Sequence, residues 1–229
     1  KFLKPSSNIL GYSQREIDDF SVKLDWPLDA MHITYIGAYT DLQESYFGDL
    51  DFTPAEFLDQ AQDLDVELNS HELRFTSSDE QALRWIAGIY YQNTKRNLHT
   101  VARVEPASAP LFGGTGYLTL IDTVDNNENT ASAVFSQFEY DISDATELSF
   151  SLRYDRDERD QISSGQSETF SAWQPKLSLT HQLNDDHMIY GTFSTGFRSG
   201  GFNADGSLFD DEYLSNYEVG FKSSLWDQR

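Results

Sequence analysis

The chain has 229 residues, no cysteine and a net charge of −22, from 16 basic and 38 acidic side chains. Such an acidic chain does not suit a nucleic-acid partner, because DNA and RNA are bound through clustered lysines and arginines. The lack of cysteine excludes disulfide frameworks and thiolate metal sites, and it fits an exported bacterial protein.

The sequence has no apolar run near the roughly 18 residues that a transmembrane helix needs. Strands of a membrane β-barrel escape such a search, because their outward apolar and inward polar residues average to a hydrophilic value. Residues 1–5 (KFLKP) lack the apolar region of a signal peptide. Either the chain is cytosolic or its N-terminal part is missing, and the ending of residues 226–229 beside a predicted strand also indicates truncation.

In chain order, alternating apolar and polar residues predict about nine β-strands of roughly 8–12 residues. This length suits a tilted strand that crosses a bilayer. The alternating segments lie at residues 20–28, 31–39, 73–76, 83–91, 134–140, 147–154, 176–180, 189–197 and 217–225.

The connections between these strands alternate between short and long. Outer-membrane barrels have this order, with tight periplasmic turns and long extracellular loops, whereas a β-sandwich mixes its connection lengths. Charged residues on the non-apolar face fit a water-filled or plugged barrel, although a sandwich with an outward polar face would also accommodate them. The short turns are expected near 27–30, 78–81, 141–146 and 183–187, and the long polar stretches at about 40–67, 94–130, 155–169 and 199–212.

Aromatic residues lie near the ends of the alternating segments. Interfacial girdles of membrane barrels prefer such positions, and cross-strand aromatic pairing in a soluble sheet is the alternative explanation. The residues are Trp26, Tyr39, Trp85, Tyr91, Tyr154, Trp173 and Trp226.

Three stretches resemble the TonB-dependent receptor family. Residues 76–91 (TSSDEQALRWIAGIYY) resemble a mid-barrel hairpin of that family. Residues 190–203 (YGTFSTGFRSGGFN) resemble its strand-and-loop signature, and residues 216–222 (NYEVGFK) resemble the strand that follows. The order and spacing of the three agree with the family, and the resemblance covers most of the chain from about residue 18.

The resemblance implies a transmembrane β-barrel in the outer membrane of a Gram-negative bacterium. Such receptors import scarce ligands, most often ferric siderophores, with energy relayed through TonB. The implied partners are outer-membrane lipid, a small-molecule ligand such as a metal chelate, and the TonB complex, which would act through a plug segment that is missing here. We therefore expect residues 1–229 to be a partial barrel domain without plug and C-terminal strands, an open curved antiparallel sheet with long loops on one rim.

The most unusual stretch is the acidic segment 40–67. The sequence Thr53-Pro54-Ala55-Glu56 has the features of a helix start, and an apolar stripe at Phe57, Leu58, Ala61 and Leu64 follows. We therefore expect about two helical turns in this loop. Its acidic residues form either a solvated surface that repels anions or a site for Ca²⁺ or a cationic ligand.

Four aromatic residues in the predicted extracellular loops are the candidate ligand contacts: Tyr46, Phe47, Phe112 and Tyr117. Their rings could stack on a catecholate or sugar ligand, or they could pack the loops together. His99, expected in a long loop, could touch a bound metal complex. Residues 155–160 are expected to form a hydrated loop, and residues 113–116 a glycine-rich loop tip.

Catalytic constellations, metal-ligand spacings and cofactor motifs are absent from the sequence, so we expect neither an enzyme nor a cofactor. Two alternatives to the receptor stay open. A passive porin or adhesin barrel would lack a plug upstream, and a secreted carbohydrate-binding β-sandwich would carry long loops at both ends of its sheets.

Overall fold

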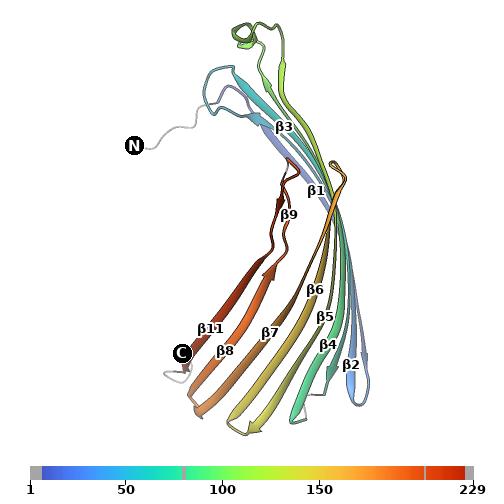
Figure 1. The fold of residues 1–229 in the computed structure, drawn as a ribbon, viewed down its shortest axis with the longest axis vertical. Coiled ribbons are helices and arrows are strands. Elements are labelled where there is room, and N and C mark those ends of the chain that lie inside the picture. The colour runs from blue at the N-terminus through green and yellow to red at the C-terminus, as the bar shows by residue number, and fades with distance from the viewer. Residues whose placement is uncertain (1–6, 79–80, 204, 225–229) are drawn as a thin grey trace.

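A computed structural model describes residues 7–78, 81–203 and 205–224, and these form one curved antiparallel sheet of nine strands (Figure 1). Each strand pairs with its neighbours in chain order, except that β8 pairs with β11 across a small two-stranded hairpin. The sheet strands are β1 (Tyr12–Pro27), β2 (Met31–Asp49), β3 (Leu58–Ser77), β4 (Leu83–Val104), β5 (Leu118–Ser143), β6 (Thr146–Gln161), β7 (Gln166–Asn184), β8 (His187–Arg198) and β11 (Glu212–Ser223). The hairpin is β9 (Gly201–Phe202) and β10 (Leu208–Phe209), and a 3₁₀ helix η1 (Ala109–Phe112) lies between β4 and β5.

The two rims of the sheet differ as predicted. Short turns join β1 to β2, β3 to β4, β5 to β6 and β7 to β8 at one rim, and the η1 segment and the β9–β10 hairpin lie at the other. The open antiparallel sheet and its nine strands are therefore confirmed. The described residues form one main sheet layer, whereas a β-sandwich consists of two sheets packed face to face. The β-sandwich alternative is therefore excluded for this part of the chain. No described helix is long and apolar enough to span a membrane.

The strands are longer than predicted, from 12 residues in β8 to 26 in β5. Most of the expected long loops 40–67, 94–130 and 155–169 are strand. The backbone ladder continues past the point where the apolar alternation stops, for example from Leu68–Thr94 to Leu58–Val104 between β3 and β4. Hydropathy does not report this continuation, because ladder hydrogen bonds form whether the side chains are apolar or polar.

The predicted helix in segment 40–67 is wrong. Residues 50–57 form a short loop, and β3 begins at Leu58. The Asp51 carboxylate accepts a hydrogen bond from the Leu58 backbone N–H at 2.9 Å, and Asp49 Oδ1 accepts from the Asp51 and Phe52 N–H groups, both at 3.0 Å. Local side-chain acceptors therefore hold a turn where a helix start was expected.

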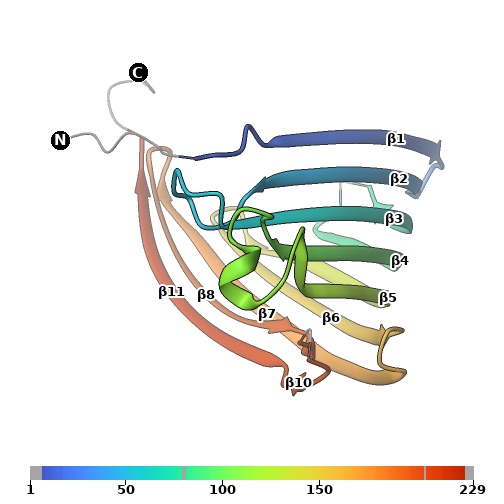
Figure 2. The ribbon, with the colours of Figure 1, turned by 90° about the horizontal axis from the view of Figure 1, so that it is seen from above.

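The two faces of the sheet differ in polarity and in crowding. Apolar side chains on one face are splayed, with exposed fractions of 43% for Leu24 and 56% for Ile89. On the other face the side chains are crowded, with 21% for Arg84 and 14% for Asp155. The sheet is curved (Figure 2). Because side chains converge on the inside of a curved sheet, the crowded polar face is the concave inner wall and the apolar face is convex.

Six of the seven aromatic residues expected at interfaces share the convex apolar face, which follows from their register and alternation along the strands. Tyr154 and Trp173 are paired there, with ring centroids 4.8 Å apart. Trp226 lies outside the described residues.

Towards the loop rim, the polarity of the two faces is exchanged. On the convex face of β3, Phe75 and Leu73 are followed by Glu67, Asp65 and Asp63. On the inner wall of the same strand the order is reversed, from polar residues near the turns to Leu68, Val66 and Leu64. The apolar belt of the convex face therefore ends near the register row Tyr39–Asn69–Asn93.

Candidate functional site

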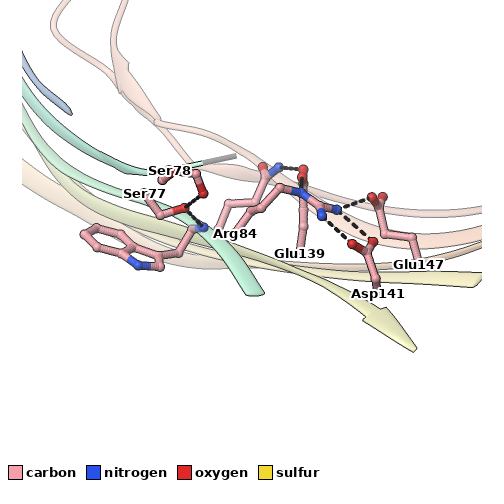
Figure 3. A network of polar contacts seen from close by, with 8 residues as sticks. Ser77, Ser78, Arg84, Glu139, Asp141 and Glu147 are labelled. Carbon is pink, nitrogen blue, oxygen red and sulfur yellow. Dashed lines mark hydrogen bonds and ion pairs between the residues drawn. The ribbon is translucent and has the colours of Figure 1, made fainter. Parts of the chain in front are cut away.

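The inner wall near the turns is tied by a cluster of one cation and three carboxylates (Figure 3). Arg84 of β4 contacts Asp141 of β5 through Nη1 at 2.5 Å and Nη2 at 3.0 Å, and Glu147 of β6 through Nη2 at 2.7 Å. Its Nε lies 3.5 Å from Glu139. One guanidinium thus joins three strands, and the cluster keeps an excess of negative charge.

A small cavity of about 100 Å³ lies beside this cluster, and Arg84, Trp85 and Ser77 are among its lining residues. The Ser77 hydroxyl accepts a hydrogen bond from the Trp85 backbone N–H at 2.9 Å, which closes the β3–β4 turn. Through these contacts, the polar residues near the turns hold neighbouring strands of the wall together.

The loop end of the inner wall carries an apolar surface that the sequence did not predict. Register and alternation place its members on the concave side of β1–β4, closer to the loop rim than the polar residues near the turns. A concave apolar surface with adjacent polar groups is the usual form of a small-molecule site. This inner apolar patch consists of Ile17, Leu42, Leu64, Val66, Leu68 and Leu98.

Polar groups border the patch on its β5 side. Arg96 Nη1 donates to Asp125 Oδ2 at 2.8 Å, and the Gln161 side chain donates to the other oxygen of Asp125. The register of β4, β5 and β6 places these three residues on the inner wall. The loop end of the wall therefore combines apolar residues with polar ones, which include the Arg15–Glu44 ion pair beside Leu42 and Leu64. Such a mixture suits an amphiphilic ligand.

Two of the predicted ligand residues, Tyr46 and Phe47, lie in strand β2 and not in a loop. Because they are adjacent in a strand, they point to opposite faces. Tyr46 shares the inner wall with the patch, whereas Phe47 lies on the convex face, where its ring is 6.1 Å from that of Tyr12. Geometry thus separates the pair, and only Tyr46 borders the candidate site.

The other two predicted residues lie in the connection between β4 and β5. Phe112 ends η1 and stacks on Phe57, with ring centroids 6.2 Å apart. The Tyr117 ring lies under the guanidinium of Arg103 at 4.3 Å. Both rings are more than half exposed, so they stand on the rim and do not line the inner wall.

His99 is in strand β4, where Nε2 lies 2.8 Å from Asp122 Oδ1, so its expected loop position is wrong. Its strand neighbours Asn97 and Lys95 border a hollow on the convex face with several carboxylates of segment 40–67. Within the part of the chain that the structure describes, no group of three or more His, Cys, Asp or Glu residues could hold a metal ion.

Residues 155–160 are also strand, not loop. Most of their charges are paired along β6, for example Asp155 with Arg153 at 2.6 Å and Arg159 with Asp157 at 3.0 Å. The glycine-rich tip at 113–116 does lie outside the strands, and Gly113 and Gly116 have positive φ angles of 75° and 78°.

A scan against family models matches residues 4–229 to the family described as TonB dependent receptor-like, beta-barrel. Among solved structures, the ferric yersiniabactin uptake receptor from Yersinia pestis has a TM-score of 0.72 at 17% identity, over 93% of this chain and 34% of that one. The ferric preacinetobactin receptor from Acinetobacter baumannii gives 0.69 at 12% identity, over 98% and 38%.

A copper transporter gives a TM-score of 0.70 at 11% identity, over 92% of this chain and 36% of that one. At such low identity these likenesses show the fold alone. The chain spans little more than a third of the length of these three structures.

Proposed function

Because the chain belongs to the TonB-dependent receptor β-barrel family, whose members are receptors and transporters and not enzymes, we propose that it takes part in the import of a scarce ligand across the outer membrane of a Gram-negative bacterium. The ligand is a ferric siderophore, and the energy comes through TonB. The chain is the central part of the barrel, and a plug and further strands belong to the same receptor.

The observation that carries this proposal is the exchange of polarity along the strands. The convex face is apolar over the span of the belt, as a lipid-facing surface must be. Beyond the belt, the inner wall becomes apolar at Leu42, Val66 and Leu98, where it would meet a ligand that arrives from outside. Two of the similar structures carry names of ferric-siderophore receptors, which supports the choice of ligand.

The proposal is tested by uptake of radioactive iron supplied as a panel of ferric siderophores. We expect a strain that lacks the gene to lose uptake of one member of the panel, and a strain that lacks TonB to lose it equally. Uptake that persists without TonB would favour the passive porin. Unchanged uptake of every siderophore in the strain that lacks the gene would refute the proposal that the ligand is a ferric siderophore.

A matched pair of substitutions then tests the inner wall. Tyr46→Ala removes a ring from the inner wall, and Phe47→Ala removes one from the convex face of the same strand. Loss of an aromatic contact costs about 1 kcal/mol, so Tyr46→Ala is expected to weaken binding of the transported siderophore roughly fivefold. Phe47→Ala should leave the affinity unchanged, and equal effects of the two would place the ligand elsewhere.

A further inference from the structure

A second cavity, of about 150 Å³, lies where the β9–β10 hairpin meets the inner wall of β5 and β6. The strand residues whose side chains point to the inner wall there are amides and one arginine, by register with the rest of the wall. We call it the hairpin pocket, and it is lined by Asn127, Asn129, Arg159, Asp160, Gln161, Gly200, Gly201, Phe202 and Phe209.

Arg159 in the hairpin pocket has an unused donor. Its Nη2 group donates to Asp157 at 3.0 Å and also to the Ser199 hydroxyl at the start of the hairpin. Its Nε is buried and has no hydrogen-bond partner among the described residues. A buried donor without an acceptor is costly, so the pocket favours a ligand that brings an oxygen acceptor.

Asn129 adds both a donor and an acceptor to the same pocket. Its side chain makes no hydrogen bond within the described part of the chain, although its neighbours Asn127 and Gln161 do. An amide that can both donate and accept matches a hydroxyl group, which also does both.

The charge of the pocket disfavours an anionic ligand. The guanidinium of Arg159 is already paired with the carboxylate of Asp157, which lies on the same wall of β6. A carboxylate or phosphate ligand would meet this negative charge without a free cation. A neutral hydroxyl accepts from Arg159 Nε without that repulsion.

The remaining lining consists of two glycines and two phenylalanines. Phe202 and Phe209 come from the two strands of the hairpin and point to opposite faces of it. The Phe209 ring lies over Gly201, in the space that a side chain there would fill. A volume of about 150 Å³ is smaller than the roughly 300–1,000 Å³ of pockets that enclose a whole drug-sized ligand, so the pocket holds a group of about one ring. We propose that the hairpin pocket binds a neutral, sugar-like polyhydroxyl ring, as part of the imported ligand; that last clause rests on the proposed function.

Methyl β-D-glucoside and methyl β-D-glucuronide are the probes, because they differ only in the carboxylate. Saturation-transfer NMR titrations are made on the protein as its gene encodes it, purified in an amine-oxide detergent, since maltoside detergents carry sugars. We expect the glucoside to bind more tightly than the glucuronide. Asn129→Ala is expected to raise the dissociation constant of the glucoside about fivefold, the effect of one lost hydrogen bond.

Asn97→Ala is the matched control, because Asn97 is an exposed residue on the convex face. It should leave the dissociation constant unchanged, and Arg159→Lys, which keeps the charge but removes Nε, should raise it as Asn129→Ala does. Each of three results would overturn the proposal: no binding of the glucoside, tighter binding of the glucuronide than of the glucoside, or an unchanged dissociation constant of the glucoside in the Asn129→Ala variant. Iron uptake plays no part in this titration, so loss of the siderophore assignment would leave its result intact.

Discussion

Asp59 shows how a single buried charge shapes the loop end of the sheet. Its side chain is fully buried and receives two hydrogen bonds from Arg103, at 2.8 and 3.1 Å. The same guanidinium covers the ring of Tyr117 at 4.3 Å. One arginine therefore neutralises a carboxylate that water cannot reach and also positions a residue of the rim.

Arg103→Met keeps the length of the side chain and removes its charge. Breaking a buried pair from one side costs about 3–5 kcal/mol, and the partial exposure of Arg103, 29%, reduces this to about 2 kcal/mol. We expect hydrogen exchange at the paired residues Leu58 and Val104 to become roughly thirtyfold faster.

Lys95→Met is the control for this change, because Lys95 is an exposed cation on the same strand. It should leave exchange at Leu58 and Val104 unaltered. Equal acceleration by both variants would mean that the net charge of the sheet, and not the Asp59–Arg103 pair, governs stability at this end.

At the scale of the strand, the convex face of β4 carries both kinds of surface. Ile89 lies within the apolar belt and is 56% exposed, whereas Asn97 lies on the same face beyond the belt. An arginine at the membrane midplane of a barrel costs about 2–4 kcal/mol, and about 0–1 near the interface. Ile89→Arg should therefore reduce the heat-resistant folded fraction strongly, and Asn97→Arg should not.

The measurement is the heat-dependent shift in electrophoretic mobility of the protein extracted from outer membranes. Both variants introduce the same side chain into the same strand, so a difference reports the surroundings alone. If Ile89→Arg folds as well as Asn97→Arg, the belt does not face hydrocarbon.

The β2–β3 loop gives a prediction about pH. Hydrogen bonds from the Thr53 side chain and the Leu58 backbone N–H hold the pKa of Asp51 below its ordinary value of 3.8. A lowered carboxyl pKa stabilises the loop above pH 3.8, and this contribution is lost as the pH falls through the folded-state pKa. The protection of the Leu58 amide against hydrogen exchange should therefore fall on acidification.

Asp51→Asn removes the titrating group and should abolish this acid effect. The comparison is the ratio of Leu58 exchange rates in the two proteins at each pH, which cancels the intrinsic pH dependence of exchange. A ratio that stays constant from neutral pH to below 3.8 would show that the loop does not depend on the Asp51 carboxylate.

These strands also show what could be predicted from sequence. Trp85, Ala87 and Ile89 alternate with other residues across the apolar belt, and this alternation predicts β4 from the sequence. Leu64, Val66 and Leu68 alternate too, but on the opposite face, and the nearby spacing of Phe57, Leu58 and Ala61 imitates a helix. Only pairing with β2 and β4 decides which face these residues occupy, and that information is not local.

The candidate site was harder to predict than the fold, for the same reason. Tyr46 could be chosen as an aromatic residue, but its separation from Phe47 depends on their being in a strand. The hairpin pocket brings Asn129 and Arg159 next to Phe202 and Phe209, which are distant in sequence. Its chemistry appears only when the β9–β10 hairpin meets β6.

At the scale of the whole molecule, β1 and β11 are the two edges of the described sheet, each paired on one side only. Unpaired backbone groups are not tolerated in hydrocarbon, and exposed edges promote association. If the chain is the central part of a closed barrel, the protein that its gene encodes must cover both edges with further strands.

Hydrogen exchange can test this closure, because alternate residues of an edge strand point their backbone N–H groups away from the neighbouring strand. In the protein as its gene encodes it, we expect slow exchange throughout β1 (Tyr12–Pro27) and β11 (Glu212–Ser223), as in the central β4. In residues 1–229 produced alone in detergent, alternate N–H groups of β1 and β11 should exchange rapidly while those of β4 stay protected. Rapid exchange at both edges of the encoded protein would mean that the sheet stays open, and a barrel receptor would then have to be abandoned.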